Sequence, residues 1–365
     1  TRMEERMNFL KPRKPTRRIS VGPVKIGAGA DIAVQSMTNT PTRDIDATVE
    51  QIRKLTDAGC EIIRVAVPDE EAARAVTPIK DRVGIPVIAD IHFDYRLAVK
   101  AAECGADGLR INPGNIGDPA KVGKVVECAK YHAIPIRVGV NSGSLEKDIV
   151  RSHGNGPEAM TESALRNIEI LEGFGFHDIK ISVKASDVAR TVQAYRSISE
   201  KTDIPLHLGI TEAGGLYAGI TKSALGIGML LSEGIGDTIR VSLTRDPVEE
   251  VRTAWEILRC LDLRKRGVEI ISCPTCGRCG IDLFDIAEKA EKALLCYKTP
   301  VKVAIMGCVV NGPGEAKEAD LGIAGGQGTG VLFKKGEIIR KIEENELLEV
   351  LLKEVEQFVK DSGGE

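Results

Sequence analysis

The stretch IPVIADIHFDYRLAVKAAECGADGLR, residues 85–110, decides the fold of this chain. It begins with a short apolar run at 86–90, continues through a segment of helical character, and leads into a second apolar run at 108–112. A buried strand, a helix and a second buried strand in this order form the repeating unit of a parallel α/β fold. The stretch therefore predicts two parallel strands joined by a helix.

The same unit recurs along roughly the first 260 residues. Eight runs have the length and composition of buried strands: 32–37, 62–67, 86–90, 108–112, 135–140, 179–184, 205–210 and 238–243. With a helix after each strand, the last one ending near Cys260, they predict a closed (β/α)8 TIM-type barrel. An open doubly wound sheet built from the same elements is the alternative.

The predicted strands form two alternating sets. Three odd-numbered strands are entered through the same dipeptide: Ile85-Pro86, Ile134-Pro135 and Ile204-Pro205. The even-numbered strands follow a glycine and carry a cation at a similar depth: Arg64, Arg110, Lys180 and Arg240. Alternate strands of a TIM barrel supply the four side chains of one interior layer. The four cations are therefore predicted to form one ring inside the barrel.

Buried cations without partners suffer desolvation, which an anionic ligand would relieve. Further polar residues lie in the odd strands or toward the carboxyl ends of the strands: Asp90, His92, Asn112, Arg137, Asn141, Ser182, Lys184, His207, Thr211, Glu212 and Ser242. TIM barrels carry their active sites at that end, and guanidinium groups suit phosphate oxygens. A small diphosphate or polyphosphate fits the number of cations better than a single carboxylate. The alternative is an internal network in which Asp90, Glu212 and the acids at strand entries neutralise the arginines.

A second domain is expected to follow the barrel, with the barrel at 1–263 and the smaller domain at 264–365. Its pattern predicts an α+β unit with strands at 268–272, 302–306, 321–324, 330–334 and 337–341 and helices at 281–293 and 346–360. The last barrel helix runs from the mouth back to the opposite end. The second domain therefore begins a barrel height away from its own active site, and we expect a head-to-tail homodimer in which each second domain caps the partner barrel.

Cysteines of the second domain have the spacing of metal ligands. Cys273-Pro274-Thr275-Cys276 supplies two thiolates from one turn, and Cys308 supplies a third. An iron-sulfur cluster is favoured over structural zinc. Zinc would usually take a fourth cysteine or a histidine, and all five histidines precede residue 210. Cys279 either extends the motif or stands beside it.

Composition limits the functions that remain. A net charge of −3 and a pI near 6.1 give no overall attraction to nucleic acid or to an anionic membrane surface. There is no run of about 18 apolar residues, so we expect no membrane span. The basic stretch 11–18 is not followed by an apolar segment, and the nine cysteines then indicate a reducing cytoplasm.

Six stretches closely resemble the 4-hydroxy-3-methylbut-2-enyl diphosphate synthase family, in its bacterial two-domain form: VIADIHFDYR at 87–96, LRINPGN at 109–115, IKISVKAS at 179–186, LGITEAG at 208–214, ISCPTCGR at 271–278 and MGCVVNGPGE at 306–315. The resemblance covers essentially the whole chain. It implies a pteroate-synthase-like barrel that binds 2-C-methyl-D-erythritol 2,4-cyclodiphosphate. It also implies two-electron reduction of this substrate to the linear hydroxybutenyl diphosphate, a step of isoprenoid biosynthesis by the methylerythritol phosphate route.

The resemblance further implies a cofactor and a set of roles. A [4Fe-4S] cluster would be held by Cys273, Cys276, Cys308 and Glu315, with flavodoxin or ferredoxin as electron donor. The carboxylate of Glu315 is a more readily displaced ligand than a thiolate. The diphosphate would be held by Arg64, Arg110, Arg137, Lys184 and Arg240 with Asn141 and Ser242, while Lys180 is a weaker candidate. Asn112, Ser182 and Thr211 are further substrate-site candidates.

Glu212 is the expected proton donor, with His92, Asp90 and His207 as second choices. Two other classes of function are compatible with the sequence. One is a redox-free pteroate-synthase-like transferase whose tail is held by structural zinc. The other is an iron-sulfur carrier or sensor without catalytic activity.

Overall fold

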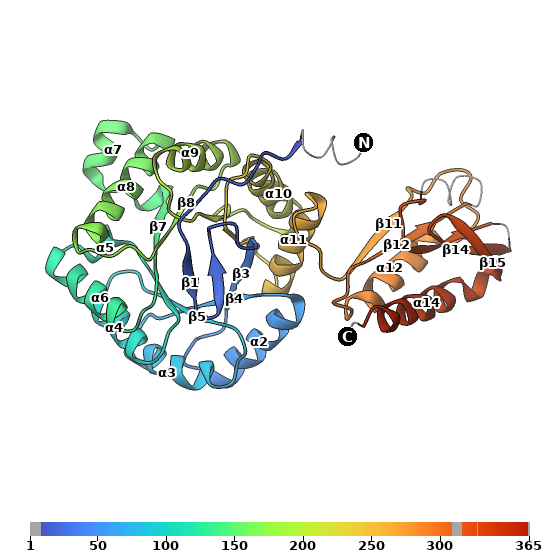
Figure 1. Ribbon diagram of the computed structural model, residues 1–365, viewed down its shortest axis with the longest axis horizontal. Coiled ribbons are helices and arrows are strands. Elements are labelled where there is room, and N and C mark those ends of the chain that lie inside the picture. The colour runs from blue at the N-terminus through green and yellow to red at the C-terminus, as the bar shows by residue number, and fades with distance from the viewer. Residues whose placement is uncertain (1–8, 309–315, 327, 364–365) are drawn as a thin grey trace. The chain divides into compact units, whose positions relative to one another are not determined.

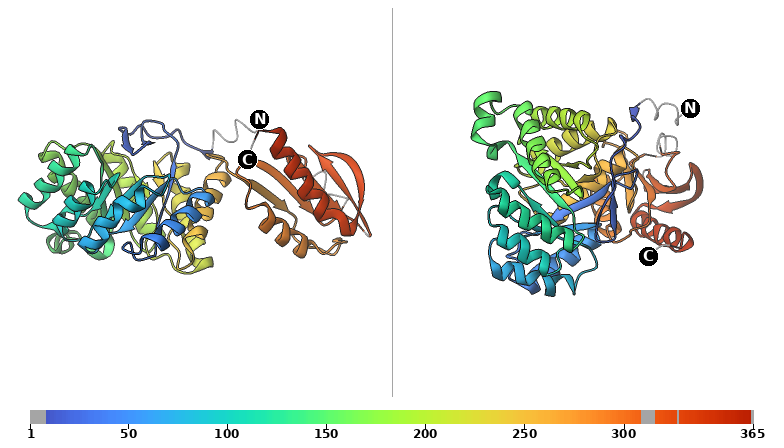
Figure 2. Two further views of the ribbon diagram at one scale, coloured as in Figure 1. Left: turned by 90° about the horizontal axis from the view of Figure 1, so that it is seen from below. Right: turned by 60° about the vertical axis from the view of Figure 1, so that its left-hand side comes forward.

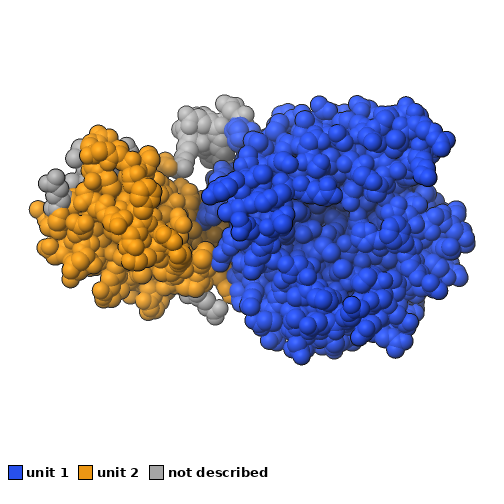
Figure 3. Space-filling view, turned by 180° about the vertical axis from the view of Figure 1, so that it is seen from behind, with its two compact units in different colours: residues 1–264 blue, residues 265–365 orange. Residues whose placement is uncertain are grey.

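The computed structural model describes residues 9–308, 316–326 and 328–363. The chain divides into two compact units, Thr1–Arg264 and Lys265–Glu365 (Figure 3). In the described residues, no helix is long and apolar enough to cross a membrane.

Unit 1 is a parallel barrel (Figure 1). Its strands are β3 (Ala33–Met37), β4 (Ile62–Ala66), β5 (Val87–Asp90), β6 (Gly108–Ile111), β7 (Ile136–Asn141), β8 (Ile179–Lys184), β9 (His207–Leu208) and β10 (Thr238–Ile239). The sheet order is β8-β7-β6-β5-β4-β3-β10-β9, and a parallel bridge between Ile181 and Leu206 joins its two ends. The predicted (β/α)8 fold is confirmed, and the open sheet is wrong.

Helices surround the sheet on its outside (Figures 1 and 2). They are α2 (Ile45–Ala58), α3 (Glu70–Lys80), α4 (Tyr95–Glu103), α5 (Pro113–Ile116), α6 (Pro119–Tyr131), α7 (Lys147–His153), α8 (Pro157–Gly173), α9 (Val188–Lys201), α10 (Leu216–Ser232) and α11 (Pro247–Cys260). Six of them begin after an aspartate whose carboxylate accepts a backbone N–H of the first turn: Asp44, Asp69, Asp94, Asp118, Asp187 and Asp246. Each such cap stabilises its helix by about 1 kcal/mol, so the sequence itself sets where these helices start.

A short hairpin packs against the amino-terminal end of the barrel. Its strands, β1 (Ile19–Val21) and β2 (Val24–Ile26), pair antiparallel. The buried side chains of Ile19 and Ile26 share a core with Ile62 and Ile88 from the barrel interior. This apolar plug leaves the opposite, carboxyl end as the polar mouth. The hairpin was not predicted from the sequence.

Strand register assigns the inward side chains to layers of four, each drawn from alternate strands. Three successive layers follow one another toward the carboxyl end of the strands. The lowest of the three consists of Gln35, Ile88, Arg137 and His207. The middle one consists of Arg64, Arg110, Ser182 and Arg240, and the upper one of Met37, Asp90, Gly139 and Gly209. The predicted cationic ring therefore contains Ser182 at its β8 position instead of Lys180. Lys180 precedes Ser182 by two residues and lies deeper, beside Arg137 in the register.

Strands β9 and β10 are shorter than predicted, with two residues each. Pro205 cannot donate a backbone hydrogen bond where the run at 205–210 was expected to begin. The ladder nevertheless continues irregularly, since the amide of Arg240 donates to the carbonyl of Leu208 at 3.0 Å. Arg240 is thereby fixed at the edge of the mouth.

Unit 2 is an α+β layer structure (Figure 1). Its sheet has the order β11 (Val268–Ser272), β12 (Val301–Met306), β13 (Leu321–Gly325), β14 (Thr329–Lys334) and β15 (Glu337–Glu343). The first three strands are parallel and the last two pair antiparallel. Helices α12 (Leu283–Leu294) and α14 (Leu347–Asp361) share one hydrophobic core with the sheet. The predicted α+β class is confirmed.

Candidate functional site

Arg64, Arg110, Ser182 and Arg240 form the arginine layer of the barrel. Asp90, at the end of β5, pairs with two of these arginines. Asp90 Oδ1 accepts a hydrogen bond from Arg110 Nη1 at 3.1 Å, and its Oδ2 lies 3.5 Å from Arg64 Nε. Burial raises the pKa of Asp90, but Arg64 and Arg110 outweigh burial and hold that pKa below its usual value. Asp90 is therefore an anchoring carboxylate. His92 lies at the rim, with Nδ1 3.4 Å from Arg110 Nη1.

A second carboxylate, Glu250, fixes Arg240. It lies buried in the first turns of α11, and its Oε2 accepts from Arg240 Nη2 at 3.3 Å. Its oxygens also accept from the amide of Leu243 and the hydroxyl of Ser36. Glu250 was not predicted from the sequence as a site residue. The available signal was the pair Glu249-Glu250 in the first turn of the helix after the eighth strand, because only one of two adjacent helical residues can face the barrel.

The cations at the mouth outnumber the buried carboxylates. Arg64, Arg110, Lys184 and Arg240 lie in or above the arginine layer, and Arg137 lies in the layer directly below, close enough for Arg64 and Arg110 to lower its pKa. Among the described residues, the buried acids that pair with members of this group are Asp90 and Glu250. Burial lowers the pKa of Arg64 to about 10, and burial followed by neighbouring cations lowers the pKa values of Arg137 and Lys184 well below their usual ranges. These shifts reflect the cost of burying cations without counter-charges. The arrangement favours an anionic ligand.

Two glycines make room for these side chains. A Cβ at Gly139 would lie 2.5 Å from Arg110 Nε, and a Cβ at Gly209 would lie 2.6 Å from Lys184 Nζ. Both glycines belong to the layer directly above the arginine layer. The missing side chains at these two positions thus leave the space that the ends of Arg110 and Lys184 occupy. Neither glycine was singled out as a site residue from the sequence.

Lys180 and His207 lie below the arginine layer and are fully buried. In the described part of the chain, Lys180 Nζ and His207 Nε2 have no hydrogen-bond partner, and His207 Nδ1 lies 2.8 Å from the hydroxyl of Thr238. Burial lowers the pKa of Lys180 to about 7 and that of His207 well below its usual range. Both residues therefore lie below the rim, with His207 in the same layer as Arg137 and Lys180 beside Arg137 in the strand register.

The remaining candidates lie at or near the carboxyl ends of strands. Asn141, Thr211 and Ser242 are half-buried, and Ser182 is buried within the arginine layer. Asn112 is buried and caps α5, because its Oδ1 accepts from the amide of Gly114 at 3.1 Å. Glu212 is exposed and has a left-handed backbone with a φ of 51°. A positive φ is costly for a residue with a side chain and recurs at functional sites.

The cysteine motif follows two adjacent parallel strands of unit 2. Cys273 follows β11, Cys308 follows β12 after one residue, and Ser272 pairs with Ile305 in the register. The amide of Gly307 donates to Cys273 Sγ at 3.2 Å, and the amide of Gly280 donates to the carbonyl of Gly307 at 3.0 Å. Strand geometry thus brings the turn and the later cysteine to one edge of the sheet.

The thiols at this edge differ in their surroundings. Hydrogen bonds from the backbone and side chain of Arg278 lower the pKa of Cys276. Cys279 Sγ instead donates to the carbonyl of Ile281 at 3.3 Å. Glu315 lies outside the described residues. Among residues 9–308, 316–326 and 328–363, no three Cys, His, Asp or Glu side chains are grouped closely enough to hold one metal ion.

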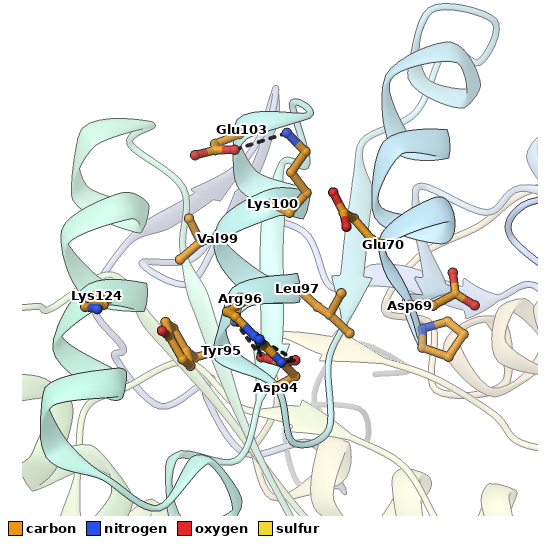
Figure 4. A pocket seen from close by; sticks show the side chains of 11 residues that line it. Asp69, Glu70, Asp94, Tyr95, Arg96, Leu97, Val99, Lys100, Glu103 and Lys124 are labelled. Carbon is orange, nitrogen blue, oxygen red and sulfur yellow. Dashed lines mark hydrogen bonds and ion pairs between the residues drawn. The ribbon is translucent and has the colours of Figure 1, made fainter.

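A groove of about 740 Å³ lies outside the barrel against α3, α4 and α6 (Figure 4). Its charged side chains already pair with neighbours. Arg96 binds Asp94 at 2.7 Å, Lys100 lies 3.4 Å from Glu103, and Lys124 lies over the ring of Tyr95. The groove therefore does not have the excess of cations found at the mouth.

Two family models match the chain, one for each unit. The GcpE TIM-barrel domain matches residues 16–255, and the GcpE protein C-terminal domain matches residues 269–357. Two relatives carry the name 4-hydroxy-3-methylbut-2-en-1-yl diphosphate synthase (flavodoxin). That of Desulfotalea psychrophila is 59% identical over 95% of this chain and 96% of its own length. That of Caldanaerobacter subterraneus subsp. tengcongensis is 60% identical over 97% of this chain and 100% of its own length.

A solved dihydropteroate synthase from Stenotrophomonas maltophilia is 13% identical to this chain. It covers 67% of this chain and 98% of its own, with a TM-score of 0.49.

Proposed function

The chain belongs to the GcpE family of 4-hydroxy-3-methylbut-2-en-1-yl diphosphate synthases, and from this premise we propose how its residues share the reaction. The enzyme opens 2-C-methyl-D-erythritol 2,4-cyclodiphosphate and reduces it by two electrons to 4-hydroxy-3-methylbut-2-en-1-yl diphosphate. The C–O bond to one phosphate breaks, and one hydroxyl leaves as water. A redox-free transferase with a zinc tail is not favoured by these relatives.

The mouth of the barrel binds the cyclic diphosphate. The observation that carries this assignment is the buried excess of positive charge around Asp90 and Glu250. Arg64, Arg110, Arg137, Lys184 and Arg240 contact the phosphate oxygens, with Asn112, Asn141, Ser182, Thr211 and Ser242 as neutral partners. Ring opening adds negative charge to the diphosphate, and donors that are already oriented stabilise that charge without reorganising. Lys180 lies below these contacts, and with a pKa of about 7 it adds positive charge there only in its protonated form.

Glu212 delivers the proton that turns the leaving hydroxyl into water. Its position after β9, its exposure and its left-handed φ support this role. Asp90 is a weaker candidate because its lowered pKa keeps it ionised. His207 is weaker because burial keeps it neutral and distant from the rim. His92, at the rim beside Arg110, is the second choice.

A [4Fe-4S] cluster is held by Cys273, Cys276 and Cys308, with Glu315 as fourth ligand. The amide of Gly307 pointing at Cys273 Sγ supports the fit, because hydrogen bonds to cluster thiolates are usual in iron-sulfur proteins. Each ligand of a cluster binds a different iron atom, so the ligands need not meet at one ion. When bound, the cluster supplies single electrons and Lewis acidity. The lowered pKa of Cys276 favours its thiolate form.

Flavodoxin is the proposed electron donor, in keeping with the names of the relatives, and ferredoxin is the alternative. A head-to-tail homodimer is the proposed assembly. It is supported by Arg264, whose guanidinium binds Glu61 and the carbonyl of Ile32 just before β4 and β3. Unit 1 therefore ends at the floor of its barrel, opposite the mouth. The nine free cysteines support a reducing cytoplasm as the location.

One experiment tests the redox assignment. Protein purified without oxygen is analysed for iron and acid-labile sulfide, and its visible spectrum is recorded before and after dithionite. About four iron and four sulfide ions per chain, with absorbance that bleaches on reduction, are expected. One zinc ion per chain without sulfide or visible absorbance would overturn the cluster.

A further inference from the structure

Arg110 crosses the backbone of β7 at Gly139. Arg110 Nη2 donates to the carbonyl of Gly139 at 3.4 Å, and a Cβ at Gly139 would lie 2.5 Å from Nε, 3.0 Å from Nη2 and 3.1 Å from Cζ. The nearest atoms to that missing side chain thus all belong to one guanidinium group. On its other side the same group binds Asp90 at 3.1 Å and approaches His92. Arg110 is held between β5 and the bare backbone of β7.

Backbone conformation does not account for this glycine. Gly139 is not among the glycines with positive φ, so its backbone is open to any residue. Gly209 is different, because a Cβ there would also lie 2.5 Å from the carbonyl oxygen of Arg240, which is backbone. At Gly139 the clash falls only on the far end of a flexible side chain. Adding a methyl group there would displace Arg110 and leave the strand in place.

We propose that Gly139 is a positioning residue for the substrate, because its missing side chain sets the direction of the Arg110 guanidinium toward the diphosphate. This inference rests on the proposed binding of the diphosphate by Arg110. Alanine at this position pushes Nε away from β7 and breaks the alignment of the guanidinium with Asp90. The arginine stays charged and inside the barrel, but it no longer presents two N–H groups in the direction fixed by Asp90 and β7.

The test compares Gly139→Ala with Gly108→Ala in the anaerobically purified holoenzyme. Gly108 is a matched control in β6, because a Cβ there would meet its nearest atoms at the ordinary distance of 3.4 Å. Pyrophosphate binding is measured by titration calorimetry. KM and kcat are measured in assays with the cyclodiphosphate, and the melting temperature is measured by circular dichroism. For Gly139→Ala we expect a loss of pyrophosphate affinity of about tenfold or more and a matching rise in KM. Gly108→Ala should keep the affinity and KM of the wild type.

A double-mutant cycle with Arg110→Ala decides whether the effect passes through the arginine. Arg110→Ala alone should weaken pyrophosphate binding, and Gly139→Ala should cause no further loss in that background. If Gly139→Ala alone folds poorly, recovery of its melting temperature in the Arg110→Ala background supports the same steric coupling. Wild-type affinity in Gly139→Ala, or an equal loss in both backgrounds, would overturn the inference. An Arg110→Ala enzyme with wild-type affinity would instead remove Arg110 from the proposed site.

Discussion

Glu250 holds Arg240 in place across the rim of the barrel, with Arg240 Nη2 3.3 Å from Glu250 Oε2. Arg240 directly follows β10 and Glu250 lies in α11, and both side chains are largely buried. Because Glu250 also accepts from Ser36 in β3 and from Leu243 beyond β10, it ties the first strand of the barrel to the segment that follows the last strand. Its loss would leave a buried guanidinium, an amide and a hydroxyl without this acceptor.

Glu250→Ala is expected to lower the free energy of unfolding by about 3–5 kcal/mol, the usual cost of removing one partner of a buried ion pair. Urea denaturation of the two proteins measures this difference. Glu249→Ala is the control, since Glu249 pairs with Arg252 at the surface and its loss should cost at most about 1 kcal/mol. Equal midpoints for all three proteins would contradict the structural role of Glu250.

Lys184→Met is expected to raise stability while lowering diphosphate affinity. Lys184 is buried among arginines, and burial is the main cause of its lowered pKa, so an apolar side chain of similar length removes an unfavourable charge. The same change removes one contact to phosphate. The melting temperature should therefore rise while the affinity for pyrophosphate falls. A variant that loses stability together with affinity would show that Lys184 has a structural partner.

Lys180 is expected to make stability depend on pH above neutrality. Its pKa is about 7 in the folded protein and near 10.5 in the unfolded chain, so between these values the unfolded chain binds more protons. Stability then rises with pH, by at most about 1.4 kcal/mol per pH unit. The facing groups are Arg137, Asp237 and Arg64, together with His207 from β9.

Lys180→Met should abolish this gain, measured as the difference in urea midpoint between pH 7 and pH 9. The exposed residue Lys25 supplies the control variant Lys25→Met, which should keep the wild-type slope. The same change in urea midpoint between pH 7 and pH 9 for the wild type and Lys180→Met would show that Lys180 stays charged in the folded protein.

Glu212→Gly is expected to fold at least as well as the wild type and to lose turnover. Glycine relieves the left-handed φ of 51°, which costs a residue with a side chain on the order of 1 kcal/mol. The proton donor is lost at the same time. Glu212→Gln keeps the strained left-handed backbone and loses only the carboxyl group. It should therefore lower kcat while KM changes little. Wild-type kcat in both variants would remove Glu212 from the reaction.

Several features could be read from the sequence because one local rule decides each. Alternation of apolar runs and helices gave the barrel, and Arg64, Arg110 and Arg240 do share the layer expected for even strands. Lys180 does not share this layer, because the register between β7 and β8 places it beside Arg137, two residues before Ser182. Register depends on hydrogen bonding to both adjacent strands, so the glycine-to-cation spacing within one strand could not reveal it.

Other features depend on atoms that come together only in the folded barrel. Glu250 looks like any acid in the first turns of a helix, and such acids are common at surfaces. Gly139 stands in a strand without a turn or a positive φ, and only the path of Arg110 explains it. The hairpin over the floor was too short to give a periodic signal. These are long-range packing relations, and a single sequence carries no local mark of them.

The anchoring of Arg264 beneath the barrel has a genetic consequence. If each mouth is completed by unit 2 of the partner chain, a chain with Lys184→Met and a chain with Cys273→Ser are each inactive as homodimers at substrate concentrations too low to fill the weakened Lys184→Met barrel. A mixed dimer pairs the intact barrel of one chain with the intact cysteines of the other. Reassembly of equal amounts should therefore restore about a quarter of wild-type activity, since half of the dimers are mixed and each has one functional site. Two alleles that fail separately would then complement each other in one cell.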